Sequence, residues 1–306
     1  MSYHLGKNIL ATVTYYDVLD MPLSAFEIWK HLLVQEVSQV TREPITLRQV
    51  FGSFASDTLN SKVSHKNGFY FLRGRDDLVT RRIRAEKISV GKLKRIRRLA
   101  RWLVYIPYVR MLGATGSLAM KNGEHESDWD IFVVLRSGKI WSGRTMLTGF
   151  LHLIGKRRHH GKIQDRVCLN YFVTDDNLEI GTKDLFSAHE YSFLIPLWNF
   201  PLFQIFELKN RWIRDYYPNF TPTTLPSLWT LKNSPPARHI QKILERVFDL
   251  PNLERWLAGW QKEKIFRNPK THIEGSLIEA SDRALIFLPR PRGPRVFQKF
   301  KERLNV

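Results

Sequence analysis

The chain has 306 residues, of which 43% are hydrophobic and 25% are charged, and this composition excludes a disordered, collagenous or low-complexity protein. A single cysteine, Cys168, excludes a disulfide framework and any zinc site made from several thiolates. This cysteine content and the absence of a basic-then-apolar leader fit a reducing, cytoplasmic location. The most apolar stretch, 193–206, contains two prolines and is shorter than the ~20 residues of a spanning helix, so we expect no membrane span.

The charge balance is strongly basic, with 48 lysines and arginines against 29 acidic residues and a formal net charge of +19. Residues 111–220 are nearly neutral, whereas residues 1–110 and 221–306 carry the excess. Basic flanks of this kind suit nucleic acid, nucleotides or an anionic lipid surface. Charge alone leaves open a basic protein with no such partner.

Residues 1–75 begin with three helical patterns. The first covers residues 8–20. Ser24 and Glu27 have the spacing of a capping box and open the second pattern, and Thr46 starts the third.

Two short apolar runs, 63–65 and 69–72, then flank Asn67-Gly68, which is a strong hairpin turn signal. Three helices followed by a small hairpin is the order of a winged helix, so we expect residues 1–75 to form a winged-helix-like unit. Such units bind DNA or contact proteins. Few basic residues lie near the third helix, whereas a helix that reads DNA usually carries several, so both roles remain open.

Residues 76–107 predict a basic linking helix, because many lysines and arginines alternate there with apolar residues at helical spacing. The charged side of this helix is either a solvated face or a ridge that faces a polyanion.

Residues 108–185 alternate strands and a helix: strands at 108–112, 130–135 and 166–174, and an amphipathic helix at 141–155. Residues 186–306 predict a mainly helical C-terminal region with a proline-rich crossing and a basic tail. The fold class expected from these patterns is α+β (mixed α/β), with a core sheet in residues 108–185 and flanking helices.

The segment that carries chemistry runs from Leu112 to Leu135. Gly116 has no side chain, so a phosphate can approach its backbone, and Ser117 offers an amide and a hydroxyl at a helix start. Asp128 and Asp130 are two residues apart at the mouth of a strand and therefore point to the same face. Two close carboxylates are oxygen ligands of the kind that Mg²⁺ or Mn²⁺ prefers.

This string resembles the signature of the DNA polymerase beta superfamily of nucleotidyltransferases: Gly116-Ser117, ten residues, Asp128-Trp129-Asp130, and a hydrophobic strand. The resemblance implies that Asp128 and Asp130 are catalytic and hold Mg²⁺ or Mn²⁺ against the phosphates of a nucleoside triphosphate such as ATP. Gly116 and Ser117 would bind those phosphates. The implied reaction moves a nucleoside monophosphate onto an acceptor hydroxyl and releases pyrophosphate.

Polymerase-like members of that superfamily carry a third carboxylate on a later strand, and the matching position here is Asn170. An amide offers a carbonyl oxygen to a metal but cannot remove a proton. Three interpretations remain open: two aspartates suffice, another acid such as Asp165 or Glu179 takes part, or the site binds nucleotide with little turnover. The last of these corresponds to an alternative function, a DNA-binding regulator whose core only binds nucleotide, and a basic interaction scaffold is a third possibility.

Overall fold

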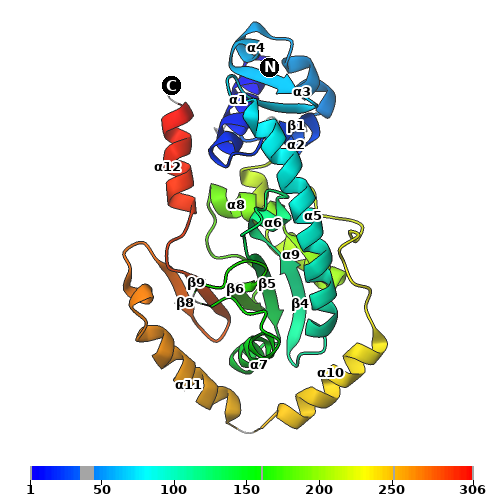
Figure 1. Cartoon of the computed structure of the whole chain (residues 1–306), viewed down its shortest axis with the longest axis vertical. Coiled ribbons are helices and arrows are strands. Elements are labelled where there is room, and N and C mark those ends of the chain that lie inside the picture. The colour runs from blue at the N-terminus through cyan, green and yellow to red at the C-terminus, as the bar shows by residue number, and fades with distance from the viewer. Residues whose placement is uncertain (1, 35–44, 160, 251, 305–306) are drawn as a thin grey trace.

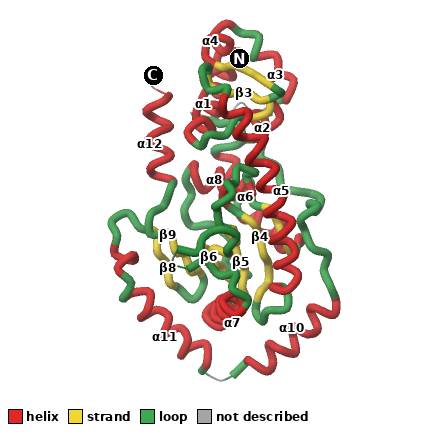
Figure 2. Tube along the Cα trace, in the orientation of Figure 1, coloured by secondary structure: helices red, strands yellow, loops and turns green. Residues whose placement is uncertain are grey.

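The computed structural model describes residues 2–34, 45–159, 161–250 and 252–304 and has the α+β class that the sequence predicts. Figure 1 shows a small N-terminal unit joined by one long helix to a larger body built on a central sheet. Helices lie around that sheet, and its strands occupy the middle of the larger body (Figure 2). No helix in the described ranges combines the length and the apolar character needed to cross a bilayer.

The described residues of the N-terminal unit pack four helices against a three-stranded antiparallel sheet of order β1-β3-β2. Its helices are α1 (Ser2–Val18), α2 (Ala25–Lys30), α3 (Leu47–Ser53) and α4 (Asp57–Lys62). Its strands are β1 (Leu23–Ser24), β2 (Val63–Lys66) and β3 (Phe69–Leu72).

Local sequence signals explain the helix start and the turn in this unit. The hydroxyl of Ser24 accepts from the Glu27 amide at 3.2 Å, and the Glu27 carboxylate accepts from the Ser24 amide at 2.8 Å, so the predicted capping box is confirmed. The hairpin turn has positive φ at Asn67 (53°) and Gly68 (79°), as the Asn-Gly signal predicts. A winged-helix function for this unit stays a prediction.

The larger body is organised around a six-stranded sheet of order β7-β4-β5-β6-β9-β8. Only β5 and β6 are parallel, and every other neighbouring pair is antiparallel. Its strands are β4 (Val109–Ala114), β5 (Trp129–Leu135), β6 (Val167–Thr174), β7 (Ile195–Trp198), β8 (Leu277–Ala280) and β9 (Ala284–Leu288).

Eight helices of the described residues complete this body and its connections. They are α5 (Asp77–Leu103), α6 (Gly116–Ala119), α7 (Ile140–Leu153), α8 (Leu185–Ser192), α9 (Phe200–Lys209), α10 (Pro235–Phe248), α11 (Leu253–Phe266) and α12 (Gly293–Leu304). Short 3₁₀ turns occupy Arg211–Asp215 and Pro269–His272.

The alternation of side chains along β5 divides the core into two layers. Phe132 and Val134 lie on the face that packs with residues of α8 and α9, whereas Ile131 and Val133 lie on the opposite face among residues of α5 and α7. Because both faces are covered, β5 is almost wholly apolar, as a buried parallel strand requires.

The sheet extends beyond the segment 108–185 that the sequence analysis assigned to the core. Strands β7, β8 and β9 come from residues 195–198 and 277–288, where the sequence pattern indicated mainly helix. The run Ala284–Leu288 is short and continuously apolar, and such a run does not distinguish a strand from a buried helix by periodicity. Pairing with β6, through Tyr171 opposite Ile286, makes it a strand.

A polar contact anchors α10 to the edge of β4. The carboxylate of Glu245 accepts from the Tyr108 amide at 2.9 Å and from the Arg110 guanidinium at 2.7 Å. Gln241, one turn earlier, donates to the carbonyls of Ile106 and Val109. Both side chains are buried, so α10 docks through hydrogen bonds rather than through an apolar face.

We expect Glu245→Ala to lower the free energy of unfolding by about 3 kcal/mol, because it removes the nearest acidic partner of Arg110 and leaves the buried Tyr108 amide without its acceptor. Urea denaturation measures this change. The matched control is Glu263→Ala, which removes an exposed partner of Arg267 and is expected to cost less than about 0.5 kcal/mol. Equal losses in the two variants would contradict the anchoring role of Glu245.

Candidate active site

The pairing of β4 with β5 places the predicted turn beside the predicted acids. Ala114 lies opposite Ile131, and the Thr115 amide donates to the Asp130 carbonyl at 3.0 Å. Gly116 follows at once with φ +63°, in the left-handed region that favours glycine. A Cβ at Gly116 would lie 2.5 Å from Asp130 Oδ2, so this glycine is required for the carboxylate to occupy its position. Ser117 continues from it into α6 and is half-buried.

Asp128 and Asp130 converge as their spacing predicts, and β6 brings Cys168 to them. One ligand atom from each of these three side chains lies within 4.8 Å of the other two. The parallel register pairs Asp130 with Cys168 directly, which explains the approach of the thiol. β5 and β6 are neighbours at the centre of the sheet (Figure 1), and the group lies where these two strands begin.

Asn170 lies at the position that the sequence analysis assigned to a third metal-site residue. Its Nδ2 donates to Asp130 Oδ1 at 3.4 Å, and its Oδ1 accepts from the Cys168 thiol at 3.0 Å. The amide therefore bridges the aspartate and the cysteine. Asp165 and Glu179, the other acids considered, are engaged elsewhere: Asp165 pairs with Arg95 and Glu179 with Lys183.

Arg158 is the cation that faces this acidic group. Its Nη1 donates to Asp128 Oδ2 at 2.6 Å and to the Cys168 sulfur at 3.3 Å. The Arg158 side chain is 43% exposed, whereas that of Asp128 is 15% exposed. The guanidinium therefore covers the acidic group from the solvent side and neutralises part of its charge.

Burial and charge repulsion raise the pKa values of three side chains at or beside this site. Burial, followed by the nearby charge of Asp128, raises the pKa of Asp130 from 3.8 to about 7, against the opposing effect of Arg158. Burial and the charges of the two aspartates raise the pKa of the Cys168 thiol to about 12. Burial and the charge of Asp130 also raise the pKa of Glu190, on α8, to about 7, with Arg292 opposing. A cation placed among these groups would relieve the repulsion.

Lys92 on α5 holds the loop that carries Asp128. Its ammonium group donates to the carbonyls of His125 and Ser127 at 2.9 and 2.6 Å and to the Ser127 hydroxyl at 3.0 Å. The Lys92 side chain is only 1% exposed, so these bonds replace its lost hydration. The loop is thereby fixed to the long helix just before the acidic pair.

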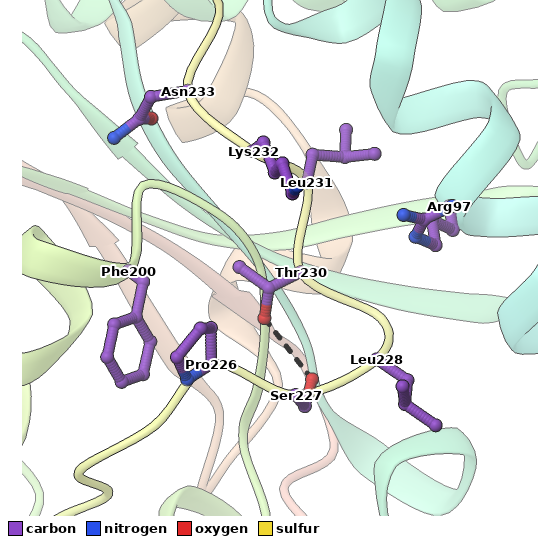
Figure 3. A pocket seen from close by; sticks show the side chains of 9 residues that line it. All are labelled: Arg97, Phe200, Pro226, Ser227, Leu228, Thr230, Leu231, Lys232 and Asn233. Atoms are coloured by element: carbon purple, nitrogen blue, oxygen red, sulfur yellow. Dashed lines mark hydrogen bonds between the residues drawn. The ribbon is translucent and has the colours of Figure 1, made fainter.

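A pocket of about 430 Å³ lies away from the acidic group and contains none of the predicted site residues (Figure 3). Arg97, Phe200, Leu228 and Thr230 are among its lining residues, and the Ser227 and Thr230 hydroxyls hydrogen-bond to each other at 3.2 Å within one loop of its wall. It adjoins β7 at the sheet edge, separated from β5 by β4.

The structure brings together Gly116, Asp128, Asp130 and Asn170, four of the five residues that the sequence singled out, and Ser117 follows on the same turn. Sequence reasoning missed Arg158 and interpreted Cys168 only as a core residue. The thiol is indeed buried, but it also contacts the site. Arg158 sits in a basic loop with Lys156 and Arg157, where nothing in the sequence distinguishes it.

Comparisons with protein-family models, with curated proteins and with solved structures found no match to this chain. The geometry of the site and the motif resemblance are therefore the observations that bear on function.

We expect Asp130→Asn to stabilise the metal-free protein at high pH only. Since the pKa of Asp130 is raised from 3.8 to about 7, the folded protein loses stability progressively from about pH 4 to pH 7, and the full penalty is present above pH 7. The variant should equal the wild type near pH 4 and exceed it by about 2 kcal/mol at pH 8.

Chemical denaturation in the presence of a chelator, at pH 4 and pH 8, checks this difference. Asp282→Asn is the control of opposite sign, because hydrogen bonds from Lys262 and Trp141 lower the pKa of Asp282. A stabilisation by Asp130→Asn that is the same at both pH values would rule out the electrostatic explanation.

A methyl group at Gly116 should disrupt the site more than the same change at another strained glycine. Gly116→Ala places a Cβ against Asp130, whereas Gly138→Ala, at φ +70°, meets no atom within 4 Å. Both variants are expected to lose about 1 kcal/mol of stability from backbone strain. Only Gly116→Ala should also weaken Mn²⁺ binding, by tenfold or more in a calorimetric titration, and equal affinities would contradict the close packing described here.

Proposed function

We propose that this chain is a metal-dependent nucleotidyltransferase that moves a nucleoside monophosphate from a nucleoside triphosphate to an acceptor hydroxyl and releases pyrophosphate. The observation that carries the proposal is the convergence of Asp128 and Asp130 beside Gly116, where the missing side chain leaves room for the Asp130 carboxylate. The motif resemblance suggests the type of reaction. The proximity of Gly116, Asp128 and Asp130 supports it, because that reaction requires these residues to lie together.

The donor set fits a divalent cation. Two carboxylates that repel each other, one of them with its pKa raised to about 7, are stabilised by a positive charge between them. Asp128 and Asp130 would hold the ion, with the Asn170 amide oxygen as a further donor after a flip of the amide. The Cys168 thiol, with its pKa raised to about 12, stays protonated and is a poor metal ligand, so the donors are oxygens of the kind that Mg²⁺ or Mn²⁺ prefers. When bound, such an ion supplies charge neutralisation for the phosphates.

The protein's own groups would then orient the triphosphate. The exposed guanidinium of Arg158 is a donor suited to phosphate oxygens once its aspartate partner is engaged elsewhere. The half-buried Ser117, next to Gly116, is the second predicted contact to the phosphates. Lys92 holds the loop that carries Asp128 in place before substrate binds. Substrate binding would then not have to supply the entropy cost of ordering this carboxylate.

The transfer step forms one bond from the acceptor oxygen to the α-phosphorus and breaks the bond from that phosphorus to the bridging oxygen of pyrophosphate. The hydroxyl proton passes to a carboxylate of the site, since Asn170 cannot accept it. Positioning and charge neutralisation provide most of the rate enhancement in a reaction of this class.

A second candidate is a DNA-binding regulator whose core binds nucleotide without turnover. Two observations favour it: the helices and hairpin of the N-terminal unit, and an amide rather than an acid at position 170. It differs from the first candidate in predicting nucleotide binding with no pyrophosphate release.

The experiment is a pyrophosphate-release assay with each of the four ribonucleoside triphosphates, Mg²⁺ or Mn²⁺, and pools of nucleic acid, protein and small-molecule acceptors. We expect release by the wild type and a loss of at least about 100-fold in Asp128→Asn and in Asp130→Asn. Asp282→Asn, a charge-matched change at an exposed carboxylate, should retain activity. Nucleotide binding without release under every condition would refute the transferase and favour the regulator.

A further inference from the structure

The long helix α5 presents a straight row of cations to solvent. The exposed basic residues at successive turns follow spacings of three and four, and Gly91 occupies the one position in the series that has no charge. We call this row the α5 stripe, and its members are Arg84, Lys87, Lys94, Arg98 and Arg101. At about 1.5 Å per residue the stripe is about 26 Å long.

The opposite side of α5 faces the protein. Leu93, Ile96, Ala100 and Leu103 are buried there, and Lys92 on the same side binds the Asp128 loop. Figure 1 shows α5 running from the N-terminal unit along the side of the larger body near β4. The C-terminal half of the stripe is therefore backed by a packed apolar face.

The stripe cations differ from their neighbours because no acidic group neutralises them. Arg81 pairs with Asp20 and Glu124, and Arg95 pairs with Asp165. Within the described residues, none of the five stripe side chains has an ion pair or a hydrogen bond to its side chain. Five cations in a line without acidic partners produce a strong positive potential, which attracts an anionic partner.

We propose that a nucleic acid strand binds along the α5 stripe through its phosphates. A linear series of cations matches a linear series of phosphates, and Trp102, which is 65% exposed beside the last cation of the stripe, offers a ring on which a base can stack. A bilayer fits less well, because a membrane-binding helix presents a broad apolar face beside its cations, whereas α5 buries its apolar face in the core.

This interaction goes beyond the proposed function, because the stripe lies on the side of α5 opposite Lys92, which contacts the Asp128 loop. Strand binding itself does not require catalysis. Asp128→Asn should therefore lose pyrophosphate release and keep nucleic acid affinity, which separates failure of the one proposal from failure of the other.

The test measures the affinity of the full chain for fluorescent 20-nucleotide single strands and duplexes by anisotropy at several salt concentrations. The stripe variant replaces all five cations with glutamine: Arg84→Gln, Lys87→Gln, Lys94→Gln, Arg98→Gln and Arg101→Gln. The control removes the same charge from exposed positions elsewhere: Lys242→Gln, Arg246→Gln, Arg255→Gln, Arg295→Gln and Lys299→Gln. Thermal melting verifies that both variants fold, and the pair variant Arg98→Gln/Arg101→Gln replaces the fivefold one if it does not.

We expect the stripe variant to bind at least about 100-fold more weakly at 100 mM KCl, and its salt slope for single strands to fall by about 3.5 from the wild-type value. The control should weaken binding less than about threefold. Equal weakening by both variants, or no binding by the wild type, would overturn the proposal. So would stripe-dependent binding to phosphatidylserine vesicles without binding to the oligonucleotides, because this result identifies a membrane surface instead.

Discussion

The central constraint on the larger body is the closeness of two partly buried carboxylates of like charge, those of Asp128 and Asp130. Asp128 and Asp130 repel each other, and burial adds to the cost of keeping both ionised. The surrounding groups reduce that cost: Arg158 from the solvent side, the amide of Asn170 from β6, and Arg292 at longer range. Without these groups the carboxylates would take up protons more readily or move apart.

Keeping the pair in place requires contributions from segments far apart in the sequence. The turn at Gly116 comes from the end of β4, the aspartates from the start of β5, and the thiol and amide from β6. Lys92 adds a fourth connection from α5, because its buried ammonium holds the loop just before Asp128. The site is therefore built from the ends of three adjacent strands and one helix, which is a rigid foundation for groups that, under the proposed function, would meet a phosphate chain.

The sequence predicted the parts of this molecule that depend on local signals. The capping residues Ser24 and Glu27, the Asn67-Gly68 turn, and the same-face relation of Asp128 and Asp130 follow from short-range geometry, and all three are present. The position of Asn170 beside Asp130 was also accessible, because it follows from matching two neighbouring strands. Arg158 and Glu190 were not, since their approach to the site depends on tertiary packing that no spacing in the chain encodes. The same reason explains why β9 was missed: it becomes a strand by pairing with β6, more than a hundred residues earlier, and β8 then pairs with β9.

The two ends of the described chain meet in space. Helix α12 packs against α1 and α8, the Arg303 guanidinium binds the Asp17 carboxylate, and β9 completes the sheet beside β6 (Figure 1). During synthesis, α1 and β6 emerge from the ribosome long before residues 277–304 are available to cover them. The parts of α1 and β6 that α12 and β9 cover therefore stay exposed during that interval, and their closure is a late step of folding.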